Sequence, residues 1–130
     1  MDARQAYAER ASELPMLIHS GQDGQTGFLS LLRHTPHHAE IYVMGVLPTH
    51  RRQGIGRQLV QAAASWCLAR DIRFLSVKTL DASVRDDNYG QTRAFYAAMG
   101  FDLFEVLPGL WRPNAPCAVF LMDLVKENRR

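Results

Sequence analysis

The sequence lacks the features that mark several special classes of protein. It has only 2 cysteines, Cys67 and Cys117, which form no metal-spaced pair and lie inside apolar runs. This usage argues against a disulfide framework and indicates two buried thiols in a reducing compartment. No apolar run approaches the length that crosses a membrane, and the first residues contain no signal-peptide core. We therefore expect a cytoplasmic protein.

Strong charge of one sign is also missing. The formal net charge is +2, with 47% hydrophobic and 22% charged residues. These proportions are typical of a globular domain and give no case for a general nucleic-acid binder. A chain of 130 residues is long enough for one sizeable core, so residues 1–130 are predicted to form a single domain.

Three patterns follow one another between residues 40 and 70. Residues 41–47 are almost continuously apolar, which predicts a strand covered on both faces, and Pro48 ends it. A basic loop with two glycines follows at residues 49–56. A helical period then begins, with apolar residues on one face at Ile55, Leu59, Ala62, Ala63 and Trp66.

The loop between this strand and helix has the chemistry of an anion site. The first N–H groups of a helix have no partner inside the helix and lie at the positive end of its dipole. Gly54 and Gly56 would let a phosphate approach the backbone, and Arg51, Arg52 and Arg57 add positive charge. An ordinary turn with solvated arginines is the alternative. The strand, basic loop, glycine pair and amphipathic helix in register favour a phosphate cradle.

The remaining segments alternate between strand and helix patterns. Before the central strand, the sequence predicts a helix over 2–13, an antiparallel hairpin of strands 14–19 and 26–32, and a loop over 33–38. After it come a strand over 74–80, a helix from Asn88 as N-cap to Gly100, a strand over 101–106, a rigid loop over 108–116 and a strand over 117–124. A short strand–helix–strand connection implies that strands 41–47 and 74–80 are parallel.

Two of these segments resemble signatures of one family. Arg51-Arg52-Gln53-Gly54-Ile55-Gly56 resembles motif A of the GNAT N-acetyltransferases, Arg/Gln-x-x-Gly-x-Gly/Ala. Phe95-Tyr96 followed by Gly100-Phe101 resembles a second signature, which stands in the family's order after the next strand. The order of elements over residues 14–124 also agrees with the family.

The resemblance implies a fold with one departure. It implies a mixed, mostly antiparallel α/β sheet with a central, splayed parallel strand pair and helices on both faces, the acyl-CoA N-acyltransferase fold. The family's first strand and helix look shortened here, because few residues stand before Leu14. An exposed sheet edge invites pairing with another chain, so we expect a homodimer.

The resemblance also implies an activity, transfer of an acetyl group from acetyl-coenzyme A to a primary amine of a small molecule or peptide. The amine would attack directly in a ternary complex, without a metal. The position of Tyr89 is often Asn in the family, which departs from the usual pantetheine contact. The implied cofactor-binding residues are Met44, Val46, Arg51, Arg52, Gln53, Gly54, Ile55, Gly56, Arg57, Tyr89 and Tyr96.

Two residues are candidates for proton transfer. Tyr96 corresponds to the family's usual general acid toward the departing thiolate, and the alternative is that it packs on its helix like Phe95. Glu40, at the start of the central strand, is a candidate general base acting through water. The alternative for Glu40 is a solvated residue at a strand end.

Three histidines and a tryptophan loop have weaker signals. His34, His37 and His38 lie in a proline-containing loop without Cys or carboxylate neighbours in sequence, so no metal site is predicted. Trp111 and Asn114 either border the acceptor or, for Trp111, cover the core.

Two other functions are compatible with the motifs. A non-catalytic acyl-coenzyme-A-binding or interaction module would keep the cradle without the chemistry. A small nucleic-acid-binding domain could use the arginine loop, but the basic stretch is short and no aromatic strand platform accompanies it.

Overall fold

The computed structural model describes residues 14–22, 24–51, 53–84, 86–112 and 114–128. The helix predicted over 2–13 and Arg52 lie outside this range. The strands are β1 (Met16–Gly21), β2 (Gly24–Thr35), β3 (His38–Val46), β4 (Phe74–Leu80), β5 (Asp102–Arg112) and β6 (Ala115–Asp123). The helices are the 3₁₀ turn η1 (Pro48–His50), α2 (Ile55–Leu68), α3 (Asp87–Met99) and α4 (Leu124–Asn128).

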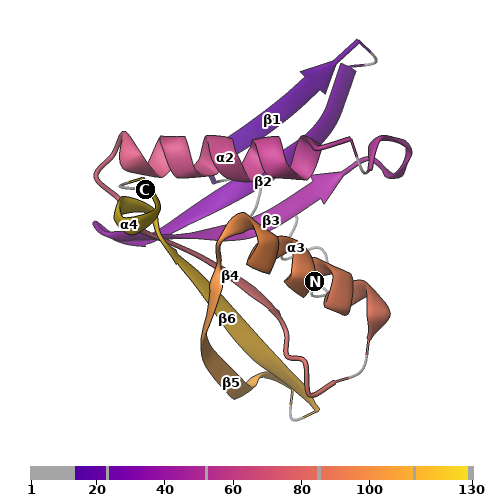
Figure 1. Ribbon diagram of the computed structural model, residues 1–130, viewed down its shortest axis with the longest axis vertical. Coiled ribbons are helices and arrows are strands. Elements are labelled where there is room, and N and C mark those ends of the chain that lie inside the picture. The colour runs from indigo at the N-terminus through magenta and orange to yellow at the C-terminus, as the bar shows by residue number, and fades with distance from the viewer. Residues whose placement is uncertain (1–13, 23, 52, 85, 113, 129–130) are drawn as a thin grey trace.

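The strands form one 6-stranded sheet in the order β1-β2-β3-β4-β6-β5 (Figure 1). β3 and β4 pair in parallel, and the other neighbours in the sheet pair antiparallel. The predicted mixed, mostly antiparallel sheet with a central parallel pair is therefore confirmed. No helix in the described part of the chain is long and apolar enough to cross a membrane.

A β-bulge in β3 lies where the parallel pair ends. Leu31 of β2 pairs with Ile41 and its neighbour Ser30 pairs with Val43, so Tyr42 is an extra residue in β3. Pairing between β3 and β4 also ends at Ile41, opposite Val77, although β3 continues to Val46 and β4 to Leu80. The two strands separate beyond this point, which confirms the predicted splay.

The core lies on one face of the sheet. Side chains alternate between faces along a strand, and Ala39 and Ile41 of β3 pack in the same buried cluster as residues of α2. Tyr96 of α3 belongs to this cluster too, so α2 and α3 cover the same face (Figure 1). The described residues place no helix against the opposite face.

The predicted apolar face of α2 is confirmed in part. The buried residues of the helix are Ile55, Leu59 and Ala63, as predicted, together with Val60 and Cys67. Ala62 is exposed. Trp66 is half-buried against the core, with the guanidinium of Arg70 over its ring at 4.0 Å from the centroid. The contact with the sheet therefore selects which apolar positions of the helical period are buried.

Two predicted loops are strands. Residues 33–38 were predicted as a loop, but β2 continues to Thr35 and pairs it with His38, which leaves a two-residue turn. Residues 108–116 were also predicted as a loop, but β5 runs to Arg112 and β6 begins at Ala115. Pro36 lies in the turn between β2 and β3, and Pro108 lies in the edge strand β5. Neither place requires the N–H group that proline lacks.

The predicted cap of α3 is wrong at the N-terminus of the helix and confirmed at its C-terminus. The helix begins at Asp87, and Asp86 rather than Asn88 caps it, since the Tyr89 N–H donates to Asp86 Oδ1 at 3.2 Å. At the other end, Gly100 has φ +106° and stops the helix as predicted.

The Phe-Tyr…Gly-Phe spacing has a physical explanation at this C-terminus. The Gly100 N–H donates to the Ala97 carbonyl at 3.1 Å, and the Phe101 N–H donates to the Tyr96 carbonyl at 3.0 Å. The Tyr96 and Phe101 rings also meet edge to face, with centroids 5.4 Å apart. These are the two hydrogen bonds and the apolar contact of a Schellman cap.

Replacing Gly100 should test how much this cap stabilises the domain. Gly100→Ala forces a side chain into a left-handed backbone conformation, so we expect a loss of about 1–2 kcal/mol in the free energy of unfolding. Gly109→Ala is the control, because its Cβ would meet no atom within 4 Å. Urea unfolding would measure both variants. Equal stabilities for the two would contradict a role for the cap.

Candidate active site

A cavity of about 810 Å³ lies where three elements meet. The end of β3 beyond the bulge forms one wall, the N-terminus of α2 a second, and one face of α3 a third. Its lining residues are Met44, Gly45, Val46, His50, Arg51, Gly54, Ile55, Gly56, Arg57, Gln91, Thr92, Phe95, Tyr96, Ala98 and Met99.

The cavity brings together most of the predicted cofactor-binding residues. Among its lining residues are Met44, Val46, Arg51, Gly54, Ile55, Gly56, Arg57 and Tyr96. Gln53 and Tyr89 are exposed and are not among them. The cavity is also lined by His50, Thr92, Phe95 and Met99, which no sequence motif predicted as site residues. Helical spacing with Tyr96 was the available signal for Thr92, Phe95 and Met99.

The N-terminus of α2 is open toward the cavity. Gly54 occupies the N-cap position in a left-handed conformation, with φ +80°, and no side chain caps the helix. The first backbone bond of the helix joins the Gln58 N–H to the Gly54 carbonyl at 3.1 Å, so the earlier N–H groups have no partner inside the helix. The first turn contains no acidic residue. This end of the helix therefore presents donors and positive potential.

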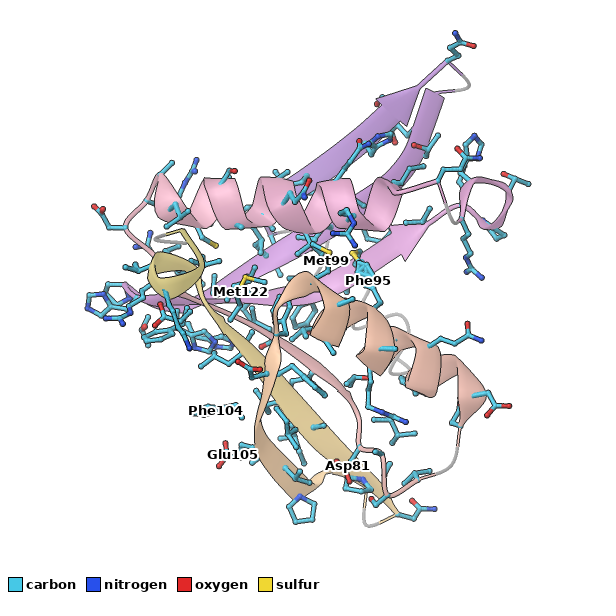
Figure 2. The ribbon with its side chains drawn as sticks, in the orientation of Figure 1. Asp81, Phe95, Met99, Phe104, Glu105 and Met122 are labelled. Atoms are coloured by element: carbon cyan, nitrogen blue, oxygen red, sulfur yellow. The ribbon has the colours of Figure 1, made fainter. Side chains whose placement is uncertain are left out.

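The two glycines of the loop have different roles. A Cβ on Gly54 would meet no atom within 4 Å, so Gly54 is required for its backbone conformation and leaves space above the helix end. A Cβ on Gly56 would lie 3.3 Å from the ring of Phe95. Gly56 thus lets α2 and α3 approach closely, and Figure 2 shows Phe95 and Met99 projecting from α3 toward α2.

Tyr96 has an apolar environment within this wall. Only 5% of the residue is exposed, and its ring meets Phe95 edge to face at 5.2 Å between centroids. Burial raises the pKa of its phenol to about 12. The hydroxyl therefore keeps its proton near neutral pH and can act as a hydrogen-bond donor.

Glu40 lies outside the cavity. It is the third residue of β3, not the first of a strand, and it is 5% exposed, so the alternative of a solvated strand-end residue is wrong. Its neighbours Ala39 and Ile41 face the core, which places Glu40 on the opposite face. Glu40 Oε1 accepts hydrogen bonds from Lys78 Nζ at 2.8 Å and His34 Nε2 at 2.6 Å.

The histidines near Glu40 form a polar cluster on that face. The rings of His34 and His38 stack with centroids 5.0 Å apart, and His38 Nε2 lies 2.6 Å from Ser76 Oγ. Burial, with a smaller contribution from His34, lowers the pKa of His38. Within the described ranges, no group of three or more His, Cys, Asp or Glu side chains is arranged to hold a metal ion.

The sequence matches the model of one known protein family. The model of the acetyltransferase (GNAT) family matches residues 2–101. No curated protein matches the chain in sequence.

Solved structures share the fold at low sequence identity. A GNAT family acetyltransferase from Elizabethkingia anophelis with acetyl-CoA bound is 14% identical, with a TM-score of 0.78 over 93% of this chain and 83% of that one. The ribosomal-protein-S18-alanine N-acetyltransferase from Escherichia coli is 13% identical, with a TM-score of 0.72 over 95% and 77%. Ard1 from Thermoplasma volcanium is 17% identical, with a TM-score of 0.73 over 92% and 76%.

Proposed function

The chain belongs to the acetyltransferase (GNAT) family, and from that premise we propose that it transfers an acetyl group from acetyl-coenzyme A to a primary amine of a small molecule or peptide. The proposed route is direct attack by the amine in a ternary complex. One observation supports it most strongly: an open helix N-terminus and the part of β3 that has separated from β4 line a single cavity. The cavity volume is within the range usual for cofactor sites.

The cavity walls suggest how the cofactor would be held. The backbone N–H groups of Ile55, Gly56 and Arg57, with the Arg51 and Arg57 side chains, suit the pyrophosphate. Beyond the bulge, β2 pairs with one edge of β3, at Met44 and Val46. The other edge of β3 has left β4, so its backbone groups are placed to bond the amides of pantetheine.

Tyr96 is the proposed donor to the departing thiolate. With its pKa raised to about 12, the phenol is a weaker acid than an ordinary thiol, whose pKa is about 8.5. Full proton transfer to the thiolate would therefore be uphill. Tyr96 is better suited to stabilise the developing negative charge with a hydrogen bond.

Glu40 is the proposed acceptor of the ammonium proton, through water. It stands one residue before the last β3–β4 pair, on the face opposite the cofactor cavity. An amine could approach the strand separation from that face. Its carboxylate already accepts two hydrogen bonds on Oε1, so Oε2 is the oxygen proposed for this role.

The pairing of Glu40 is also the observation that favours a second candidate, a non-catalytic acyl-coenzyme-A-binding module. A carboxylate held by Lys78 and His34 can be structural. Radiolabelled acetyl transfer to a panel of polyamines, amino acids and peptides, with thiol release as a second readout, would separate the two. Binding of acetyl-coenzyme A without transfer to any of these amines would favour the binding module.

Substitution of Gly54 should remove the cradle. Gly54→Val strains the backbone and fills the space above the α2 N-terminus, so we expect the dissociation constant for acetyl-coenzyme A to rise at least about 100-fold, or roughly 3 kcal/mol. Gly24→Val is a matched control: Gly24 also has a positive φ, +93°, with no atom within 4 Å of its Cβ, but is the first residue of β2. Calorimetry showing the same affinity for both variants would mean that the cradle is misplaced.

Substitution of Tyr96 separates chemistry from packing. Tyr96→Phe keeps the ring and removes the donor, so we expect kcat to fall roughly 10²–10³-fold with little change in cofactor affinity or Tm. Because the folded pKa is about 12, the donor should be lost only as pH rises toward that value, and no tyrosine-dependent decline should appear below about pH 10. If packing alone matters, Tyr96→Phe will keep wild-type turnover on an identified amine and Tyr96→Ala will lose it.

A homodimer is proposed on the edge strand β5. This strand exposes Leu103 (57%), Phe104 (65%) and Leu110 (49%), and Figure 2 shows Phe104 pointing away from the sheet. We expect light scattering to give the mass of a dimer, and Phe104→Glu to give a monomer because it places a charge in the contact. Ile18→Glu on the other edge strand, β1, is the control. A monomer at high concentration of the wild-type protein would contradict the proposal.

A further inference from the structure

The chain contains only two lysines, Lys78 and Lys126. Their environments differ sharply. Lys126 is exposed on the short helix α4. Lys78 is half-buried, with 31% of its side chain exposed, and Nζ lies 2.8 Å from Glu40 Oε1. An acetyltransferase with so few amines of its own has one of them beside its candidate base.

Lys78 also lies at the strand separation. It follows Val77, the last residue of β4 that pairs with β3. Leu75 and Val77 face the core, so the Lys78 side chain lies on the opposite face with Glu40. The amine is therefore on the side from which an acceptor would approach the gap between β3 and β4.

Other titratable groups surround this amine. His34 of β2 and His38 of β3 lie on the same face, and His34 shares the Glu40 oxygen with Lys78. Lys78 also helps to lower the pKa of His38 and offsets part of the rise that burial causes in the pKa of the Cys117 thiol on β6. Cys117 is fully buried, so its thiol is less accessible than the Lys78 amine.

We propose that Lys78 Nζ is acetylated by acetyl-coenzyme A bound to the same chain, an inference that rests on the proposed function. The Glu40 carboxylate takes one proton from the ammonium group, and the nitrogen lone pair attacks the thioester carbonyl carbon. A C–N bond forms as the C–S bond breaks. The second proton that the nitrogen loses converts the departing thiolate to the thiol, which leaves an amide on Lys78.

The reaction should be slow and limited to one acetyl group. A lysine ammonium has no free lone pair until it loses a proton, which slows its attack on a thioester. A well-oriented intramolecular reaction can offset this loss of rate, because effective molarities reach roughly 10⁵–10⁸ M. Once acetylated, Lys78 carries no charge and its ion pair with Glu40 is lost.

Lys126 provides an internal control for chemical acetylation. The purified protein would be incubated with acetyl-coenzyme A at several protein concentrations and followed by peptide mass spectrometry. We expect acetylation at Lys78 to be at least about tenfold faster than at Lys126, with a rate that does not depend on protein concentration. Equal labelling of the two lysines would overturn the proposal. A rate that rises with protein concentration would also overturn it, since acetylation would then occur between chains.

Two variants test the chemistry. Glu40→Gln should slow acetylation of Lys78 roughly 10²-fold and leave that of Lys126 unchanged, because Lys78 is the lysine that contacts this carboxylate. Lys78→Arg keeps a cation beside Glu40 and should show no acetyl group at this position. A label removed by hydroxylamine would instead indicate a thioester on Cys117 and overturn the proposal.

Two measurements separate this inference from the proposed function: calorimetric binding of acetyl-coenzyme A, and acetyl transfer to the panel of free amines. Transfer to a free amine with Lys78 unmodified would overturn self-acetylation alone. Acetylation of Lys78 with no transfer to any free amine would support it and count against an external acceptor. Absence of acetyl-coenzyme A binding would overturn both.

Discussion

The site depends on the β-bulge at Tyr42. Before the bulge, β3 directs Ala39 and Ile41 into the core and pairs with β4. After it, the extra residue shifts the alternation, so that Met44 and Val46 pack against the same core. The strand can then continue beside β2 while it separates from β4. The cavity and its free strand edge both result from this separation.

The helix ends around the cavity are held by backbone geometry. Gly54 gives α2 an uncapped, left-handed start, and Gly56 brings α3 close enough for Phe95 to pack on α2. Gly100 ends α3 with a Schellman cap whose hydrogen bond reaches the Tyr96 carbonyl. The cap therefore holds the backbone of Tyr96, the candidate donor, and the rings of Phe95 and Phe101 hold its side chain. Such support matters because a small displacement of a reacting group lowers the rate of the reaction.

Electrostatics differ between the two faces of the sheet. On the cavity face, the α2 N-terminus and its arginines present positive potential without a nearby acidic residue in the first turn. On the other face, Glu40 lies among Lys78, His34 and His38. The cavity face suits an anionic cofactor, and the face with Glu40 suits an amine that must lose a proton. The strand separation lies between them.

Features that neighbouring residues control could be predicted from the sequence. The strand–loop–helix over residues 41–68, the parallel partner at 74–80 and the Gly100 stop follow from local periodicity and from φ > 0 at glycine. Family resemblance added most of the cavity residues. Other features appear only in the folded chain: the strands across 33–38 and 108–112, the bulge at Tyr42 and the partners of Glu40. These depend on cross-strand pairing and on contacts such as Glu40–Lys78, which join residues far apart in the chain. A local pattern of prolines, histidines and apolar residues does not contain that information.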